Sequence, residues 1–153
     1  FCTLCDLPEF KNALKVPETT TDLYLQRKQI SGSIPTDITL LSNLTSIDLA
    51  NNRLSGDIPK ELVHLTKLQR LALDRNNLSG NVPPELSSMV SLQYLRLTQN
   101  KLSGEVPKEL SSLTNLDSLY LNYNMFSGMI PYELSSLNKL KYLYLDHNQF
   151  IGC

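Results

Sequence analysis

The chain has 153 residues, 41% of them hydrophobic and 19% charged, and its formal net charge is -1 at pH 7. This length suits one domain with a buried core, and the near-neutral charge excludes the basic stripe that is typical of nucleic-acid binding. No uninterrupted apolar stretch approaches the roughly 18 residues that cross a bilayer. We therefore expect a soluble folded protein with no membrane segment and no nucleic-acid partner.

The first 20 residues are predicted to form an N-terminal cap, because they lie outside the repeat described below. Leu7, Phe10, Leu14 and Val16 have the spacing of one face of a short amphipathic helix that begins after Pro8. Such a helix would close one end of a repeat core.

Cys2 and Cys5 in this cap are separated by two residues, a spacing compatible with a disulfide, half a zinc site or a redox pair. A four-ligand zinc site lacks its other half, and a thioredoxin-type pair needs a βαβ context that the sequence does not provide. We expect no metal and no cofactor. The third cysteine, Cys153, permits an intermolecular bridge, a truncated pairing or a free thiol.

Residues 21–153 contain a 24-residue period, with five complete repeats and a truncated sixth. The first core position of each repeat holds Leu23, Ile47, Leu71, Leu95, Leu119 and Leu143. Counted from that position as zero, offsets 0, 2, 7, 11, 15, 18 and 21 hold only Leu, Ile, Val, Met or Phe across the five complete repeats. Such regularity does not arise by chance in a chain of this composition, and it predicts a solenoid.

Each repeat begins with an apolar pair such as Leu71 and Leu73, whose alternation indicates a short strand with one buried face. Stacked repeats would pair these strands into a parallel sheet. An asparagine follows five positions after the strand begins, where a buried amide can satisfy backbone groups of adjacent turns. It recurs as Asn52, Asn76, Asn100, Asn124 and Asn148, while Lys28 holds the position in the first repeat.

The stretches Leu54–Pro59 and Leu102–Pro107 carry the Leu-Ser-Gly-x-Ile/Val-Pro signature, and the pattern resembles the plant-specific class of leucine-rich repeats. The resemblance implies an α/β solenoid, a right-handed superhelix with a concave parallel sheet. It also implies a second short strand near Leu-Ser-Gly and 3₁₀ turns on the convex side. Relatives usually carry a disulfide-bonded cap with a tryptophan motif, which makes Cys2 and Cys5 the disulfide candidate here, although this chain has no tryptophan.

The same resemblance implies a secreted protein or the ectodomain of a larger receptor, similar to plant receptor kinases and polygalacturonase-inhibiting proteins. The N-terminal residues do not have the pattern of a signal peptide, and a mature secreted protein would look the same, so a cytoplasmic location stays open. Two sequons begin at Asn43 and Asn77, at offsets that avoid the core, and they are candidate glycosylation sites.

Function in a solenoid is expected where the repeat leaves residues free, and here that is the outward face of the strands. Register places Tyr120 beside Tyr144, Arg96 beside Tyr120, and Arg70 beside Tyr94, with both arginines in cation–π range. Tyrosine and arginine are typical of protein-binding hot spots. The predicted ligand-binding residues are Arg70, Tyr94, Arg96, Tyr120, Tyr123, Tyr142, Tyr144 and His147.

Three hypotheses apply to this face. The leading hypothesis is a recognition module that binds a protein or peptide on its concave face. The alternative is a structural protein that forms a homodimer through the tyrosine-rich face or through the uncapped end at the truncated sixth repeat. A third possibility is that the tyrosines stabilise the sheet without binding anything. An enzyme is not expected, because His64 and His147 lie in distant repeats and no nucleophile stands beside either of them in a recognisable motif.

Overall fold

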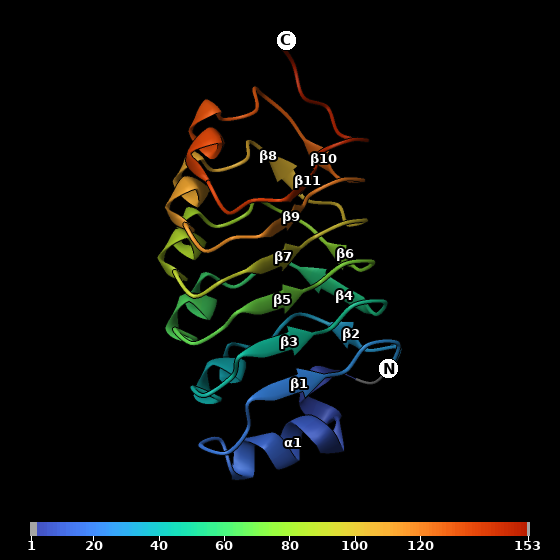
Figure 1. The fold of residues 1–153 in the computed structure, drawn as a ribbon. Coiled ribbons are helices and arrows are strands. Elements are labelled where there is room, and N and C mark those ends of the chain that lie inside the picture. Colours follow the sequence, from blue (N-terminus) through green and yellow to red (C-terminus); the bar gives the residue numbers. More distant parts are fainter. Residues whose placement is uncertain (1–2, 153) are drawn as a thin grey trace.

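The computed structural model describes residues 3–152, which form a solenoid of stacked turns (Figure 1). Each of the first five turns passes through a strand of one long sheet, a short strand on the opposite side and a 3₁₀ helix, and the sixth contributes a strand to the long sheet. Helix α1 lies at one end of the stack and residues 142–152 lie at the other (Figure 1). Cys2 and Cys153 fall outside the described residues, and Cys5 is exposed. The predicted Cys2–Cys5 disulfide therefore stays a prediction.

The N-terminal cap consists of a 3₁₀ helix η1 (Leu4–Asp6) and helix α1 (Pro8–Lys15). Pro8 occupies the first helical turn, where its missing N–H and fixed φ are tolerated. Leu4 and Phe10 are fully buried and close the core of the first repeat, while Val16 is exposed just beyond the helix. The amphipathic helix is thus formed as the sequence predicts, with Val16 outside its buried face.

The long sheet is parallel and contains one strand from each repeat in chain order. Each residue pairs with the equivalent residue of the next repeat, so Leu71 pairs with Leu95 and Tyr120 with Tyr144. Residues at one offset therefore form columns across the sheet. The strands are β1 (Asp22–Tyr24), β3 (Ser46–Asp48), β5 (Arg70–Ala72), β7 (Tyr94–Arg96), β9 (Ser118–Tyr120) and β11 (Tyr142–Tyr144).

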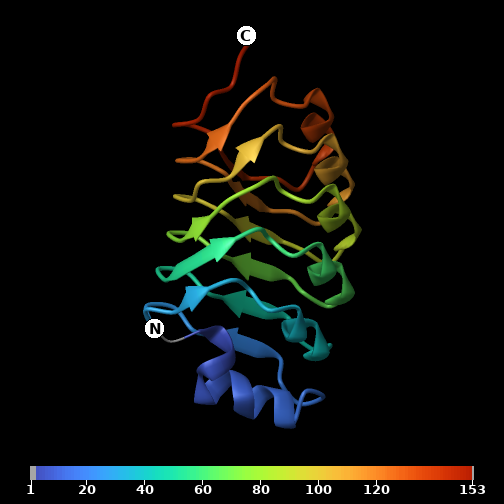
Figure 2. The same cartoon turned by 180° about the vertical axis from the view of Figure 1, so that it is seen from behind.

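Short strands form two further parallel sheets on the opposite side of the turns, as Figure 2 shows from behind. One contains β2 (Ser31–Gly32), β4 (Arg53–Gly56) and β6 (Asn77–Leu78), and the other β8 (Ser103–Gly104) and β10 (Met125–Phe126). These strands lie at or beside the Leu-Ser-Gly positions, where the resemblance implied them.

Five 3₁₀ helices stack in a column along the third side of the turns (Figure 2). A proline precedes each of them at the N-cap and cannot donate to a strand ladder. The helices are η2 (Thr36–Leu40), η3 (Lys60–His64), η4 (Pro84–Ser88), η5 (Lys108–Ser112) and η6 (Tyr132–Ser136).

The repeated asparagines form a ladder inside the stack. Asn76 Nδ2 donates to the carbonyl oxygens of Leu49 and Leu73 at 3.0 Å each, and its Oδ1 accepts the Leu54 N–H at 2.9 Å. Asn52 makes the corresponding bonds one repeat earlier, and its Oδ1 accepts the backbone N–H of Lys28. Each amide therefore joins two neighbouring repeats at the point where the strand ends, as the sequence predicts.

Candidate binding surface on the concave sheet

The C-terminal half of the long sheet carries a cluster of aromatic side chains on its outward face. The rings of Tyr120 and Tyr144 stack with centroids 4.9 Å apart and an interplanar angle of 9°. This stack follows from the register, because the two residues are paired neighbours on β9 and β11. Tyr94 and Tyr142 are exposed on the same face. The structure thus brings together four of the predicted tyrosines.

A second stack lies at the margin of the sheet. The Tyr123 ring and the His147 imidazole have centroids 4.0 Å apart, and His147 Nδ1 lies 2.7 Å from an Asp146 carboxylate oxygen. Tyr123 and His147 both have positive φ, at 56° and 54°. Residues of this size rarely adopt the left-handed region, so the surrounding backbone bonds must hold the turn in this conformation.

Arg96 links the aromatic cluster to the acidic residues of the preceding repeat. Its guanidinium carbon lies 5.4 Å from the Tyr120 ring centroid, and one terminal nitrogen lies 3.6 Å from Asp74 Oδ2. Arg70 behaves differently from the prediction. It pairs in register with Tyr94, yet its guanidinium lies 3.7 Å from Asp48 Oδ2, and the described residues contain no cation–π contact between Arg70 and Tyr94.

The N-terminal half of the same face contains a polar hollow of about 510 Å³. Asp74 lines it with a side chain only 8% exposed, and the Asp74 Oδ1 atom has no hydrogen-bond partner. This oxygen can therefore accept a further hydrogen bond. The prediction did not select Asp48 and Asp74. Each lies diagonal to an arginine of the next repeat, two offsets away, so a comparison of equal offsets does not find these pairs.

An ion pair borders the aromatic cluster. Lys141 Nζ lies 2.7 Å from Asp117 Oδ2, and the Ser118 hydroxyl donates to Asp117 Oδ1 at 2.7 Å. The hydrogen bond from Lys141, followed by that from Ser118, holds the pKa of Asp117 below its ordinary value of 3.8. The bond to the Asp117 carboxylate raises the pKa of Lys141 above its ordinary 10.5. Both groups are therefore charged at neutral pH and fix the polar edge of the cluster.

The two sequons differ in their surroundings. Asn43 Nδ2 donates to the Glu18 carbonyl oxygen at 2.7 Å, and its Oδ1 accepts a bond from Lys67 Nζ. Asn77 lies exposed on β6. The side-chain nitrogen of Asn43 is therefore occupied, whereas Asn77 faces solvent.

Residues 3–152 contain neither a membrane-crossing helix nor a cluster of metal-binding side chains. No helix in this range combines the length and the apolar character needed to cross a membrane. No group of three or more His, Cys, Asp or Glu residues in the same range has the arrangement of a metal site.

Comparison with known proteins identifies the class of this solenoid. A family model described as "Leucine-rich repeat region" matches residues 22–151. The chain belongs to the leucine-rich repeat family. No curated protein matches this leucine-rich repeat chain, but many solved structures do. Leucine-rich repeat folds are typically recognition domains without enzymatic activity.

Three of these structures are ectodomains of Arabidopsis receptor kinases. That of GASSHO1/SCHENGEN3, in complex with CASPARIAN STRIP INTEGRITY FACTOR 2, has a TM-score of 0.88 and 37% identity, covering 94% of this chain and 17% of that one. HAESA, in complex with the peptide hormone IDA and a co-receptor, has a TM-score of 0.87 and 42% identity, covering 93% and 24%. SOBIR1 has a TM-score of 0.76 and 32% identity, covering 84% and 70%. The repeats are therefore of the plant type.

The chain spans only 17% of the length of the GASSHO1/SCHENGEN3 ectodomain chain and 24% of that of HAESA. The likeness extends over nearly all of this chain, yet over a minor part of those receptors. It establishes the architecture, and it leaves the binding residues to be argued from this chain's own surface.

Proposed function

We propose that this leucine-rich repeat chain is an extracellular recognition module that binds a peptide or protein segment across the concave face of β5–β11. The observation that carries the proposal is the partly exposed Tyr120–Tyr144 stack continued by Arg96. Stacked aromatic rings are already ordered before binding, so they present apolar area at little entropic cost. The ligand-complexed ectodomains of GASSHO1/SCHENGEN3 and HAESA support a peptide as the ligand class.

The face offers two different chemical environments to one ligand. The aromatic half suits apolar or planar groups, and the hollow beside Asp74 suits a hydrogen-bond donor because Asp74 Oδ1 lacks one. Arg70 and Arg96 lie between the two halves, each only loosely paired with a carboxylate at more than 3.5 Å. They are therefore available to donate hydrogen bonds to a ligand carbonyl or carboxylate.

The test is a capture experiment from extracellular fluid, comparing the unchanged chain with a variant that combines Tyr94→Ser, Tyr120→Ser and Tyr144→Ser. The expected result is loss of the captured partner by the variant alone. Tyr24→Ser is the matched control, because Tyr24 is an exposed tyrosine on β1, away from the cluster. Circular dichroism verifies that all variants stay folded. Equal capture by the triple variant would contradict the proposal.

Self-association is the second candidate function, and a specific observation favours it. Tyr94, Tyr142 and Tyr144 are exposed on the outward face of the long sheet. An exposed aromatic surface can also pack against a second copy of the chain. Solution mass measured against concentration decides the matter, because a homodimer has twice the 17.3 kDa of the single chain.

A further inference from the structure

The fifth repeat departs from the other repeats on the flank that carries the short strands and the proline turns. Three columns of exposed positions are polar in most of the earlier repeats. At the position after glycine, Ser33, Asp57, Asn81 and Glu105 give way to Met129, and after proline, Thr36, Lys60, Pro84 and Lys108 give way to Tyr132. Three positions before the glycine, Gln29, Arg53, Asn77 and Lys101 give way to Met125.

Core packing does not explain these replacements. Asp57, Asn81 and Glu105 are all exposed, so the column that Met129 joins faces solvent in the middle of the stack. Met129 is 70% exposed and Tyr132 82% exposed. Ile151 is 66% exposed in a column that is otherwise serine. Large apolar side chains gathered on a surface mark an interaction site.

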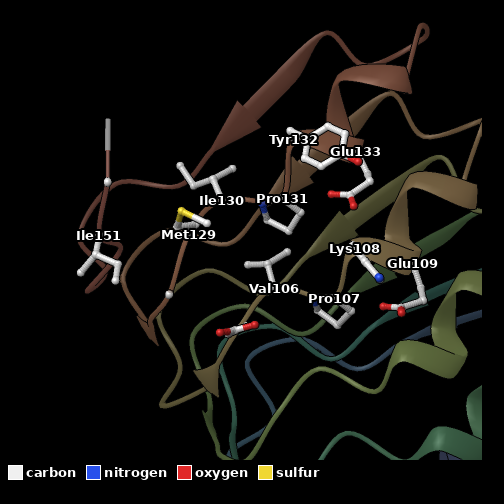
Figure 3. Close-up of a pocket in the computed structure, with 13 residues that line it drawn as sticks. Val106, Pro107, Lys108, Glu109, Met129, Ile130, Pro131, Tyr132, Glu133 and Ile151 are labelled. Atoms are coloured by element: carbon white, nitrogen blue, oxygen red, sulfur yellow. The ribbon is translucent and has the colours of Figure 1, made fainter.

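These side chains line a groove of about 870 Å³, shown in Figure 3. Val106 and Pro107 come from repeat four, and Met129 and Tyr132 come from repeat five. Ile151, from repeat six, lies near Met129 at one end of the groove (Figure 3). We name it the Met129 groove. Val106 is only 3% exposed, so the groove is apolar down to the core surface.

Carboxylates surround the groove. Glu105, Glu109 and Glu133 line it, against one lysine, Lys108. Glu109 and Glu133 end a column of acidic residues along the flank that begins with Asp37, Glu61 and Glu85. An apolar groove with a negative border attracts a segment that combines apolar side chains with positive charge.

We propose that the Met129 groove docks a partner-protein segment whose apolar side chains are flanked by lysine or arginine. The apolar groups bury against Met129, Tyr132 and Ile151, and the basic groups face Glu105, Glu109 and Glu133. The groove lies outside the long sheet, so this inference does not depend on ligand binding at the concave face. It gives the chain a second recognition surface.

The three methionines of the chain make the proposal measurable. Met125 and Met129 are exposed in or beside the groove, whereas Met89 is buried in the core and serves as an internal control. The chain is labelled with ¹³C at the methionine methyl groups and titrated with a short peptide of alternating leucine and lysine. The expected result is a saturable shift of the Met129 signal, with a smaller shift of Met125 and none of Met89.

Two peptides and two chain variants complete the test. A leucine–glutamate peptide and a serine–lysine peptide should each bind at least about tenfold more weakly, because each lacks one of the two required properties. Met129→Asn combined with Tyr132→Lys installs residues that the same columns carry in other repeats. This variant should bind the leucine–lysine peptide about tenfold more weakly, and the Met125 signal measures its binding. Tyr120→Ser with Tyr144→Ser should leave that binding unchanged.

Three outcomes would overturn the proposal. One is the absence of any methionine shift with the leucine–lysine peptide. Another is equal binding of the leucine–glutamate peptide, which would remove the role of the carboxylates. The third is a Met129 signal that moves on dilution of the chain alone, which would make the groove a contact between copies of this chain.

Discussion

At the scale of single residues, strand register and the choice of side-chain rotamer together set the contacts on the concave face. The Tyr120–Tyr144 stack follows from strand pairing, because equal offsets become neighbours. Arg70 is also a register neighbour of Tyr94, yet its long side chain turns to the Asp48 carboxylate. A repeat pattern specifies which residues are adjacent, but a flexible arginine selects among several neighbours, and only the structure decides.

The Asp117–Lys141 pair predicts a pH dependence in two directions. The lowered pKa of Asp117 contributes stability above pH 3.8 that is lost as the pH falls through its folded value. The raised pKa of Lys141 contributes stability below pH 10.5 that is lost as the pH rises through its folded value. Lys141→Met should raise the pKa of Asp117, although the Ser118 hydroxyl still keeps it below 3.8.

Carboxyl-carbon NMR against pH measures this change. Lys139→Met is the control, because Lys139 bonds the Asn115 amide oxygen and no carboxylate. An Asp117 pKa that does not move in Lys141→Met would show that the ion pair is not formed in solution.

The sequons give a second prediction at this scale. When the chain passes through a secretory pathway, we expect a glycan at Asn77, which is exposed, and none at Asn43, whose amide is bonded to Glu18 and Lys67. Intact-mass measurement of Asn77→Gln and Asn43→Gln variants checks this. The first should lose the glycan mass and the second should retain it. Loss in Asn43→Gln would mean that its hydrogen bonds do not limit access.

At the scale of elements, burial decides how much each asparagine of the ladder contributes to the free energy of unfolding. Asn76→Ala removes bonds to Leu49, Leu54 and Leu73 in a buried position, and should lower the free energy of unfolding by about 3 kcal/mol. Asn148 makes corresponding bonds but is partly exposed, so water can replace them, and Asn148→Ala should cost about 1 kcal/mol. Urea unfolding compares the two. Equal losses would contradict the role of burial.

At the scale of the whole molecule, the 24-residue period predicts the architecture because every repeat places its apolar residues at the same offsets. The cap helix, the short strands and the 3₁₀ helices all appear where the pattern or the resemblance places them. The long-sheet columns do not predict the Met129 groove, because it lies on the flank of the short strands and proline turns. The same comparison applied to the proline turns reveals it, whereas the orphaned Asp74 oxygen depends on side-chain packing that no pattern contains.

The spacing of the parallel strands in the long sheet also limits how a bound peptide can align with them. Adjacent strands lie about 4.8 Å apart, so six strands extend over about 24 Å, while an extended peptide advances about 3.4 Å per residue. A peptide laid across the strands would therefore meet the whole face with about seven residues. Its alternate side chains are about 6.8 Å apart, so their spacing does not match that of the strands. Successive side chains of the peptide therefore meet the strands at different positions. Each strand can then contact the peptide through a different residue, so the columns need not repeat one residue type.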